Sequence, residues 1–230
     1  DVETDRLTER TRFSGGSGAI ERTGVDPALL SRASAVTLAV GLGIGVVGWV
    51  TGPVSAPALG LLVAIAGAGL AYSLPPIALV RRGVGELTNA VLGGLALPLY
   101  GVATVSSVSV AGTLAVVPFT MLVGCNLLAT HWPDRDADAA VGKRTLAVRW
   151  SPRRLRMAYW TLAALAIGLT AVLAGRVLPH PVVAAQSLAL PALLWGGVVL
   201  TRQRSPLPAV TAMVVHAGAS TVAWWWLALR

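Results

Sequence analysis

Residues 108–145 read VSVAGTLAVVPFTMLVGCNLLATHWPDRDADAAVGKRT, an apolar run that ends in a cluster of charge. The run from Val108 to Thr130 is long enough for the roughly 20 residues that a membrane-spanning helix needs. Three carboxylates and two basic side chains follow it: Asp134, Asp136, Asp138, Lys143 and Arg144. In a chain that is 55% hydrophobic and only 12% charged, this concentration of charge indicates a polar site at a membrane surface.

The whole chain has the composition of an integral membrane protein. Its mean hydropathy is +0.71, and apolar runs bounded by glycine, proline and charge recur along it. We therefore predict an all-α, polytopic transmembrane helical bundle that forms a single domain over residues 1–230. The seven predicted spans are Ala33 to Val50, Ala56 to Tyr72, Val84 to Val105, Val108 to Thr130, Met157 to Gly175, Pro181 to Leu200 and Pro208 to Leu229.

The basic residues predict the topology of these spans. They gather in the segment before the first span and in the loops after the second, fourth and sixth spans, whereas only Arg176 and Arg230 fall on the other side. By the positive-inside rule, the charged loops are cytoplasmic. A net charge of +8 would suggest nucleic acid as the partner of a soluble protein, but this distribution predicts a membrane and no nucleic acid.

Two pairs of carboxylates repeat one spacing on the charged side. Asp1 and Asp5 are four residues apart, as are Asp134 and Asp138, so on a helix each pair shares a face. Adjacent carboxylates repel unless a cation lies between them, and oxygen ligands of this kind suit Mg²⁺. Alone, the first pair fits a solvated loop better than a metal site. Together, the two pairs predict a site for a metal ion and a diphosphate.

Further polar residues surround the second pair. A stripe spaced by four leads out of the fourth span: Asn126, Thr130, Asp134 and Asp138. Pro133 should bend or interrupt this helix because it cannot donate to the backbone ladder. Asp136 points away from the stripe, and we expect it to be solvated or paired with an arginine.

The loop after the second span supplies other candidates. Arg81 and Arg82 either anchor the membrane border or reach an anionic ligand. Glu86 and Asn89 enter the third span, where polar side chains usually face a cavity or a partner. We expect two isolated residues, Cys125 and His216, to be packed side chains. We assign no role to Gln186.

The motifs resemble those of one family. Residues 134–148, DRDADAAVGKRTLAV, resemble the second aspartate-rich motif of the UbiA superfamily of intramembrane aromatic prenyltransferases. Residues 1–5, DVETD, with residues 10–16, RTRFSGG, are similar to the end of the first motif. Residues 72–86 are similar to the segment between the family's fourth and fifth helices. Family members have nine transmembrane helices, so the resemblance implies that the seven spans lack the first two.

The sequence also departs from the family pattern. Thr130 and His131 stand where many relatives place an asparagine before the second motif. The ending Gly-Lys-Arg-Thr at residues 142–145 resembles 1,4-dihydroxy-2-naphthoate prenyltransferases and their archaeal relatives. This resemblance implies that the acceptor is 1,4-dihydroxy-2-naphthoate, in menaquinone biosynthesis. Other acceptors remain open: 4-hydroxybenzoate, geranylgeranylglyceryl phosphate, a chlorophyll precursor or haem.

The resemblance assigns roles to individual residues. It implies that Mg²⁺ is held by Asp1, Asp5, Asp134 and Asp138. It implies that the substrate diphosphate is bound by Arg10, Arg12, Arg81, Arg82, Lys143 and Arg144. Either Asp5 or Asp138 would take the proton of the acceptor as the catalytic carboxylate. The partners are polyprenyl diphosphate, an aromatic acceptor and the lipids of the cell membrane, with the site facing the cytoplasm.

A different class of protein also fits the basic loops. A lipid-binding or transport protein would use them to hold anionic headgroups. A transporter predicts polar residues near the bilayer midplane. The centres of the predicted spans consist almost wholly of alanine, valine, leucine and glycine, which favours the enzyme.

Overall fold

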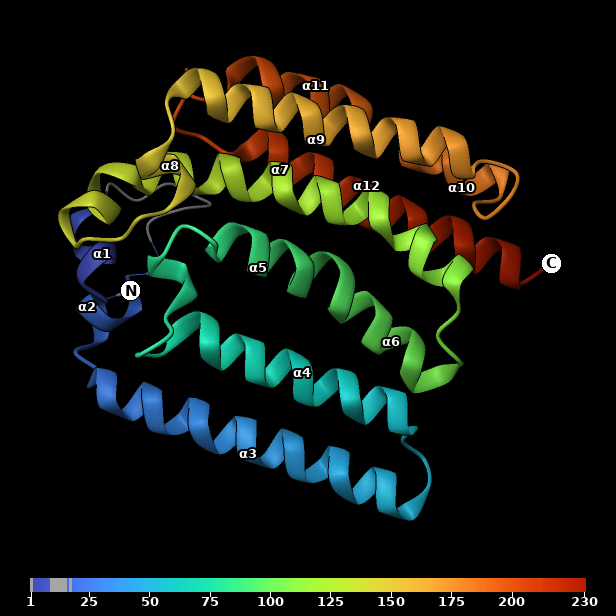
Figure 1. Cartoon of the computed structure of the whole chain (residues 1–230), viewed down its shortest axis with the longest axis horizontal. Coiled ribbons are helices and arrows are strands. Elements are labelled where there is room, and N and C mark those ends of the chain that lie inside the picture. Colours follow the sequence, from blue (N-terminus) through green and yellow to red (C-terminus); the bar gives the residue numbers. More distant parts are fainter. Residues whose placement is uncertain (1, 9–15, 17) are drawn as a thin grey trace.

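The computed structural model describes residues 2–8, 16 and 18–230, and these residues form a bundle of helices (Figure 1). Seven helical stretches are long and apolar enough to cross a membrane. They are α3 (Pro27–Thr51), α4 (Ala56–Ser73), α5 with η2 and α6 (Gly85–Val105), α7 (Val110–Ala140), α9 (Pro152–Leu173), α10 with α11 (His180–Val199) and α12 (Leu207–Ala228). The described residues also form four short helices: α1 (Val2–Leu7) and α2 (Ala19–Thr23) before the first span, and η1 (Leu79–Arg81) and α8 (Leu146–Arg149) between later spans. The predicted all-α membrane bundle is thus confirmed.

Capping side chains fix where several spans begin. Asp26, Ser55, Ser109 and Ser151 each accept a hydrogen bond from a backbone N–H in the first turn of the helix that follows. Proline in the first turn of α3, α4 and α9 supports these starts, because its missing N–H has no helical partner there. The first span therefore begins at Pro27, earlier than the hydropathy pattern predicts.

The helix α7 runs without interruption through Pro118 and Pro133 to Ala140. The expectation that Pro133 interrupts this helix was therefore wrong. Pro133 and the preceding Trp132 are buried, and α9 packs along α7. Tertiary packing of this kind stabilises a helix enough to offset the one backbone hydrogen bond that proline removes.

Two other spans are irregular. The third contains a π-helical turn, η2 (Leu92–Ala96), between α5 (Gly85–Val91) and α6 (Leu97–Val105). There Gly94 packs on α7, where the Thr120 hydroxyl donates to its carbonyl at 2.9 Å. The sixth span breaks between α10 (His180–Ser187) and α11 (Leu190–Val199).

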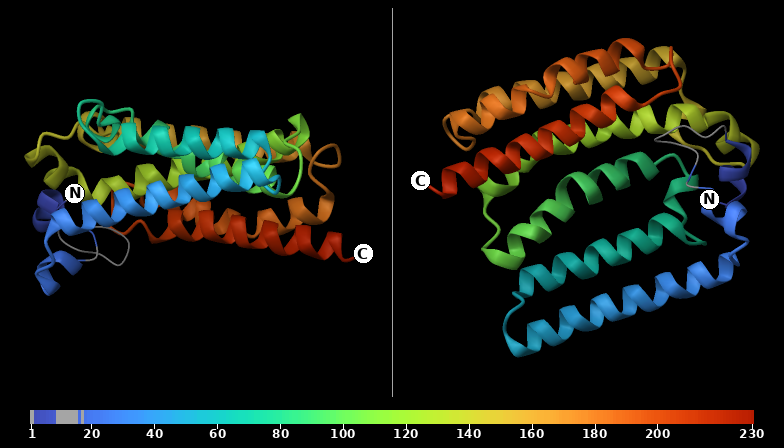
Figure 2. Two further views of the ribbon diagram at one scale, coloured as in Figure 1. Left: turned by 90° about the horizontal axis from the view of Figure 1, so that it is seen from below. Right: turned by 180° about the vertical axis from the view of Figure 1, so that it is seen from behind.

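The helix α7 lies in the middle of the bundle (Figure 1, Figure 2). It packs against α9 and α12 on one side and against α5 and η2 on the other. The largest core cluster joins α7, α9, α11 and α12, and Tyr159 at its centre donates from its hydroxyl to the carbonyl of Leu193 at 2.9 Å. Cys125 is buried in this cluster, as expected.

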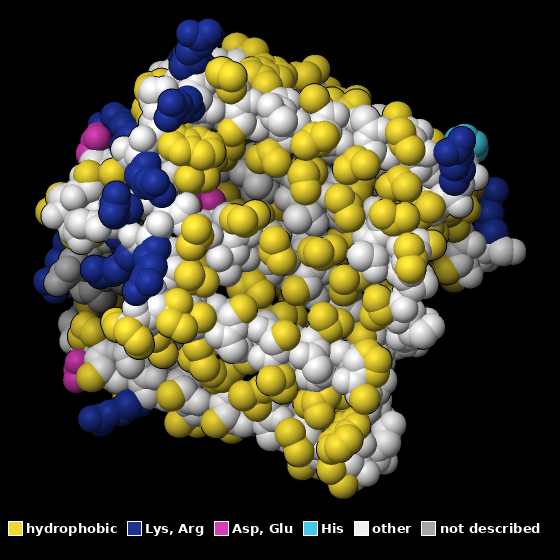
Figure 3. Space-filling view, in the orientation of Figure 1, with side chains coloured by type: hydrophobic (Ala, Val, Ile, Leu, Met, Phe, Trp, Pro, Cys, Tyr) yellow, Lys and Arg dark blue, Asp and Glu magenta, His cyan; other side chains and the backbone are white. Residues whose placement is uncertain are grey.

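Charge gathers at one end of the bundle, as Figure 3 shows. We call this end the basic end; it comprises the segments between α4 and α5, between α7 and α9 and between α11 and α12, with the first turns of α9. Its basic residues are Arg81, Arg82, Lys143, Arg144, Arg149, Arg153, Arg154, Arg156, Arg202 and Arg204. Hydrophobic side chains cover most of the remaining surface in this view. A surface of this kind is suited to contact with lipid. Together with the seven long apolar helices among the described residues, it indicates an integral membrane protein.

Candidate functional site at the basic end

A buried ion pair stands at the end of α7. Asp138 is 4% exposed, and the ammonium of Lys143 lies 3.0 Å from its Oδ1 atom. The Thr145 hydroxyl faces its Oδ2 atom at 3.5 Å. Gly142, with φ of 73°, turns the chain so that the backbone N–H of Lys143 donates to the Asp138 carbonyl at 2.9 Å. A buried carboxylate requires a cation, and the sequence supplies one five residues later.

The neighbouring carboxylates divide between two faces of α7. Asp134 lies one turn before Asp138 on the same face and is half-buried. Asp136 is exposed and pairs with Arg135 at 3.4 Å and with Arg204 at 3.7 Å. Asp136 therefore faces away from Asp134 and Asp138, as the helical period predicts.

The short helix α1 brings Asp5 to the same end of the bundle. It packs against α7, beside the end of α7 that carries Asp138 (Figure 1, Figure 2). The carboxylate of half-buried Asp5 lies directly against the α-carbon of Gly16, where a β-carbon would overlap it. Three predicted site residues lie outside the described part of the chain: Asp1, Arg10 and Arg12.

Two loops at this end pack backbone to backbone. The Arg144 N–H donates to the Arg81 carbonyl at 3.1 Å. Gly83, with φ of 77°, permits the contact, since a β-carbon there would lie 2.7 Å from the Arg144 carbonyl oxygen. The side chains of Arg81, Arg82 and Arg144 are exposed, and Arg82 donates to the carbonyl of Pro76. The structure thus gathers these three predicted cations on neighbouring loops.

Glu86 ties three elements together beside this site. Its Oε1 atom accepts from the backbone N–H of Leu146 at 2.6 Å and lies 3.1 Å from Nδ1 of His131. Its Oε2 atom is buried without a hydrogen-bond partner among the described residues. Polar side chains that enter the third span were expected to face a cavity or a partner. Glu86 meets this expectation, and its partner is His131.

Tyr72, at the end of α4, completes the polar group. It is half-buried and lies within electrostatic reach of Glu86, Lys143 and Asp138. Gly85, at the start of α5, packs against the backbone of Val80, where a β-carbon would lie 2.8 Å from the α-carbon of Val80. Sequence reasoning gave Tyr72 no role of its own; its place just before the loop of Arg81 was the available signal.

The side chains present fit Mg²⁺ better than a softer metal. No group of three or more histidine, cysteine, aspartate or glutamate side chains is gathered as a metal cage within the described ranges. Oxygen atoms that could bind a metal here belong to the Asp138 carboxylate and the Thr145 hydroxyl, and Asp134 lies one helical turn away. Mg²⁺ typically binds through one or two carboxylates and completes its shell with water and phosphate oxygens.

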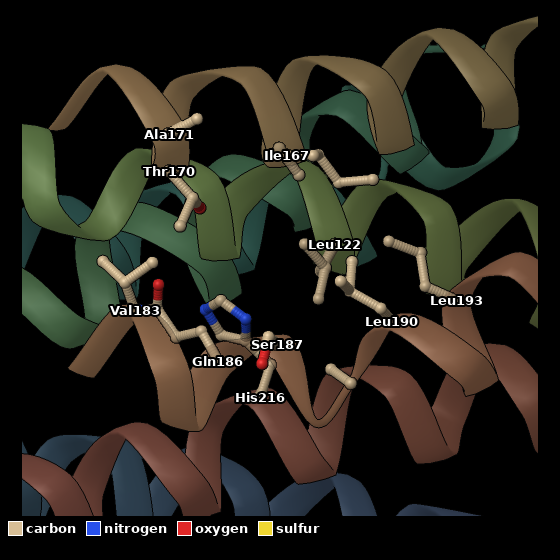
Figure 4. Close-up of a pocket in the computed structure, with 12 residues that line it drawn as sticks. Leu122, Ile167, Thr170, Ala171, Val183, Gln186, Ser187, Leu190, Leu193 and His216 are labelled. Carbon is tan, nitrogen blue, oxygen red and sulfur yellow. The ribbon is translucent and has the colours of Figure 1, made fainter. Parts of the chain in front are cut away.

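An interior cavity of about 170 Å³ lies deeper in the bundle, among α7, α9, α10, α11 and α12 (Figure 4). His216 lines it and stacks on Phe119 with ring centroids 6.0 Å apart, so it is packed, as expected. Gln186 also lines it, at the break in the sixth span, and its buried Oε1 atom has no hydrogen-bond partner in the described part of the chain. Leu122 lines the cavity three helical turns before Asp134, which at 1.5 Å per residue separates it from the basic end by about 18 Å.

Together these features define the class: a polytopic α-helical membrane protein that presents a buried carboxylate–ammonium pair and a group of arginines at one end. The sequence model of the UbiA prenyltransferase family matches residues 1–228. The chain therefore belongs to the UbiA prenyltransferase family, and it is an enzyme of the prenyltransferase class. No curated protein and no solved structure matches it.

Proposed function

We propose that the protein transfers a polyprenyl group from polyprenyl diphosphate to 1,4-dihydroxy-2-naphthoate, in a Mg²⁺-dependent reaction of menaquinone biosynthesis. The site would face the cytoplasm at the cell membrane, in line with the positive-inside rule. The observation that carries the proposal is the buried pair of Asp138 and Lys143. It sets a carboxylate and a cation side by side where apolar helices meet charged loops.

The residues divide between the metal and the diphosphate. Asp134 and Asp138 would hold Mg²⁺ from α7, together with Asp1 and Asp5. Once bound, Mg²⁺ neutralises the charge that develops on a departing diphosphate. The ammonium of Lys143 is held in place by its contact with Asp138, so it can offer a fixed positive charge to the same anion. Five arginines would add to it: Arg10, Arg12, Arg81, Arg82 and Arg144.

The rest of the chain would protect and complete the reaction. Departure of diphosphate leaves an allylic cation, which water would destroy. The apolar helices below the basic end exclude water and accommodate the prenyl tail. Both oxygens of Asp138 have partners in Lys143 and Thr145. Either Asp5 or Asp138 would take the proton of the acceptor.

The test is a transfer assay on the full chain in membranes. Labelled polyprenyl diphosphate is incubated with a panel of aromatic acceptors, with Mg²⁺ or with EDTA. We expect a prenylated product from 1,4-dihydroxy-2-naphthoate that EDTA abolishes. Product from another acceptor alone would overturn the acceptor assignment.

Two matched variants test the site in the same assay. Asp138→Ala should abolish transfer, because it removes the carboxylate at the buried pair. Asp136→Ala should retain it, since Asp136 is exposed on the opposite face and pairs with Arg135 and Arg204. Retained transfer in Asp138→Ala would show that the site lies elsewhere.

A further inference from the structure

A second charged feature lies on the outside of the bundle, between α9 and α11. It is a groove of about 460 Å³ whose lining includes Arg153, Arg156, Arg202, Trp160, Gly197 and Val198. The helices α9 and α11 lie on the opposite side of α7 from α4 and α5 (Figure 1, Figure 2). The groove is therefore separate from the polar group around Glu86 and Tyr72.

The three arginines of the groove differ in their ion pairs from the other cations at this end. Within the described ranges, none of Arg153, Arg156 and Arg202 forms an ion pair with an aspartate or glutamate. Lys143, by contrast, pairs with Asp138, and Arg204 pairs with Asp136. Arg153 and Arg202 are exposed and Arg156 is half-buried, so the three positive charges are open to an anion from the surface.

One of these arginines is held in position. Arg156 is half-buried and donates from Nη1 to the hydroxyl of Thr201. Thr201 has φ of 65°, a left-handed conformation that is rare for a β-branched residue and costs backbone strain. The strained turn places the hydroxyl where it orients the guanidinium at the groove.

The deeper part of the groove is apolar. Trp160 lies one helical turn beyond Arg156 on the same face of α9, and Val198 faces it from α11. Gly197 makes this possible, since a β-carbon there would lie 2.5 Å from the indole ring. The groove therefore changes from cationic at its outer end to aromatic and aliphatic below, which is the order of phosphate and acyl chain in a phospholipid.

We propose that the groove between α9 and α11 binds an anionic phospholipid, with the headgroup phosphate on Arg153, Arg156 and Arg202 and the upper acyl chain along Trp160. This site goes beyond prenyl transfer and does not depend on it. A free phosphate ion would satisfy the arginines but would leave the apolar half of the groove unused.

The experiment uses the full chain reconstituted in phosphatidylcholine vesicles that contain a small fraction of phosphatidylglycerol with brominated acyl chains. Bromine quenches the fluorescence of tryptophans that it contacts. We expect stronger quenching by brominated phosphatidylglycerol than by the same fraction of brominated phosphatidylcholine. Trp160→Phe should remove this difference, because Trp160 lines the groove.

Charge variants test the built site against general attraction. Each basic residue that contacts the headgroup contributes about fivefold in affinity. Arg153→Gln with Arg156→Gln should therefore raise the phosphatidylglycerol fraction that gives half of the specific quenching about 25-fold. The matched control is Arg154→Gln, which removes an exposed charge from the same turn of α9 but does not line the groove; it should leave the quenching nearly unchanged.

Three outcomes would overturn the proposal. A loss of about fivefold in Arg154→Gln, the same per charge as in the double variant, would mean general charge attraction only. Equal quenching by brominated phosphatidylcholine would mean unspecific contact with lipid. Displacement of the lipid by inorganic phosphate alone would mean a phosphate site. Circular dichroism checks that the double variant is folded, and Arg202→Gln, outside the helices, repeats the test if it is not.

Discussion

Replacing Lys143 by methionine tests whether the buried carboxylate of Asp138 needs a cation. The ammonium of Lys143 lies 3.0 Å from Oδ1 of Asp138, and both side chains are less than a tenth exposed. At an effective dielectric constant of about 20, two unit charges at this distance attract by about 5.5 kcal/mol. Removal of one partner of a buried pair typically costs about 3–5 kcal/mol. We expect Lys143→Met to lower the free energy of unfolding by about 3–5 kcal/mol.

The double variant separates the pair from the packing. Lys143→Met together with Asp138→Asn leaves neither charge buried, so it should recover most of the stability that the single variant loses. Unfolding of the full chain in detergent micelles, followed by circular dichroism, measures the three proteins under one condition. A double variant as unstable as Lys143→Met would show that the loss comes from packing of the lysine stem.

Magnesium provides the decisive comparison. In Lys143→Met, Asp138 has lost its ammonium, so Mg²⁺ should stabilise this variant more than it stabilises the original protein. At a Mg²⁺ concentration of about one hundred times its dissociation constant, the expected gain is about 2.7 kcal/mol. The double variant should gain less, because an amide replaces the carboxylate. An equal gain in the single and double variants would refute Asp138 as a metal ligand.

Three further predictions concern stability and are measured by unfolding in the same micelles. Glu86→Leu leaves two hydrogen-bond donors without their acceptor and should cost about 1.5–3 kcal/mol; an unchanged midpoint would contradict the role of Glu86 as a tie. Gly83→Ala should lower the free energy of unfolding more than Gly24→Ala, because both glycines have positive φ but only Gly83 contacts the backbone of another loop, at Arg144. Equal losses of stability in the two variants would show that this loop contact is unimportant. Gln186→Leu should stabilise the protein by about 1–3 kcal/mol, since it removes a buried acceptor without a partner among the described residues, and a loss of stability would mean that the carboxamide has a partner.

Hydropathy and helical period were sufficient to predict much of this structure. Seven spans followed from apolar runs, because the bilayer demands length and low polarity from each one. The spacing of Asp134, Asp136 and Asp138 predicted which of the three faces away, since side chains four apart share a face and the middle one does not. Both predictions depend on local properties of the chain.

Features that depend on tertiary packing could not be predicted in this way. Pro133 is a helix breaker by its own chemistry, and only the packing of α9 along α7 explains why the helix continues. Glu86 and His131 are 45 residues apart in the chain, so nothing local in one sequence joins them. The break of the sixth span at residues 188–189 lies within an apolar run that hydropathy treats as continuous.

The backbone hydrogen bond between Arg144 and Arg81 has a mechanical consequence. It fastens the loop after α7 to the loop after α4, and Gly83 keeps the two in direct contact. A displacement of the loop that carries Lys143 must therefore either break this hydrogen bond or move the backbone of Arg81 with it. The positions of these two loops are coupled through the backbone and not only through their side chains.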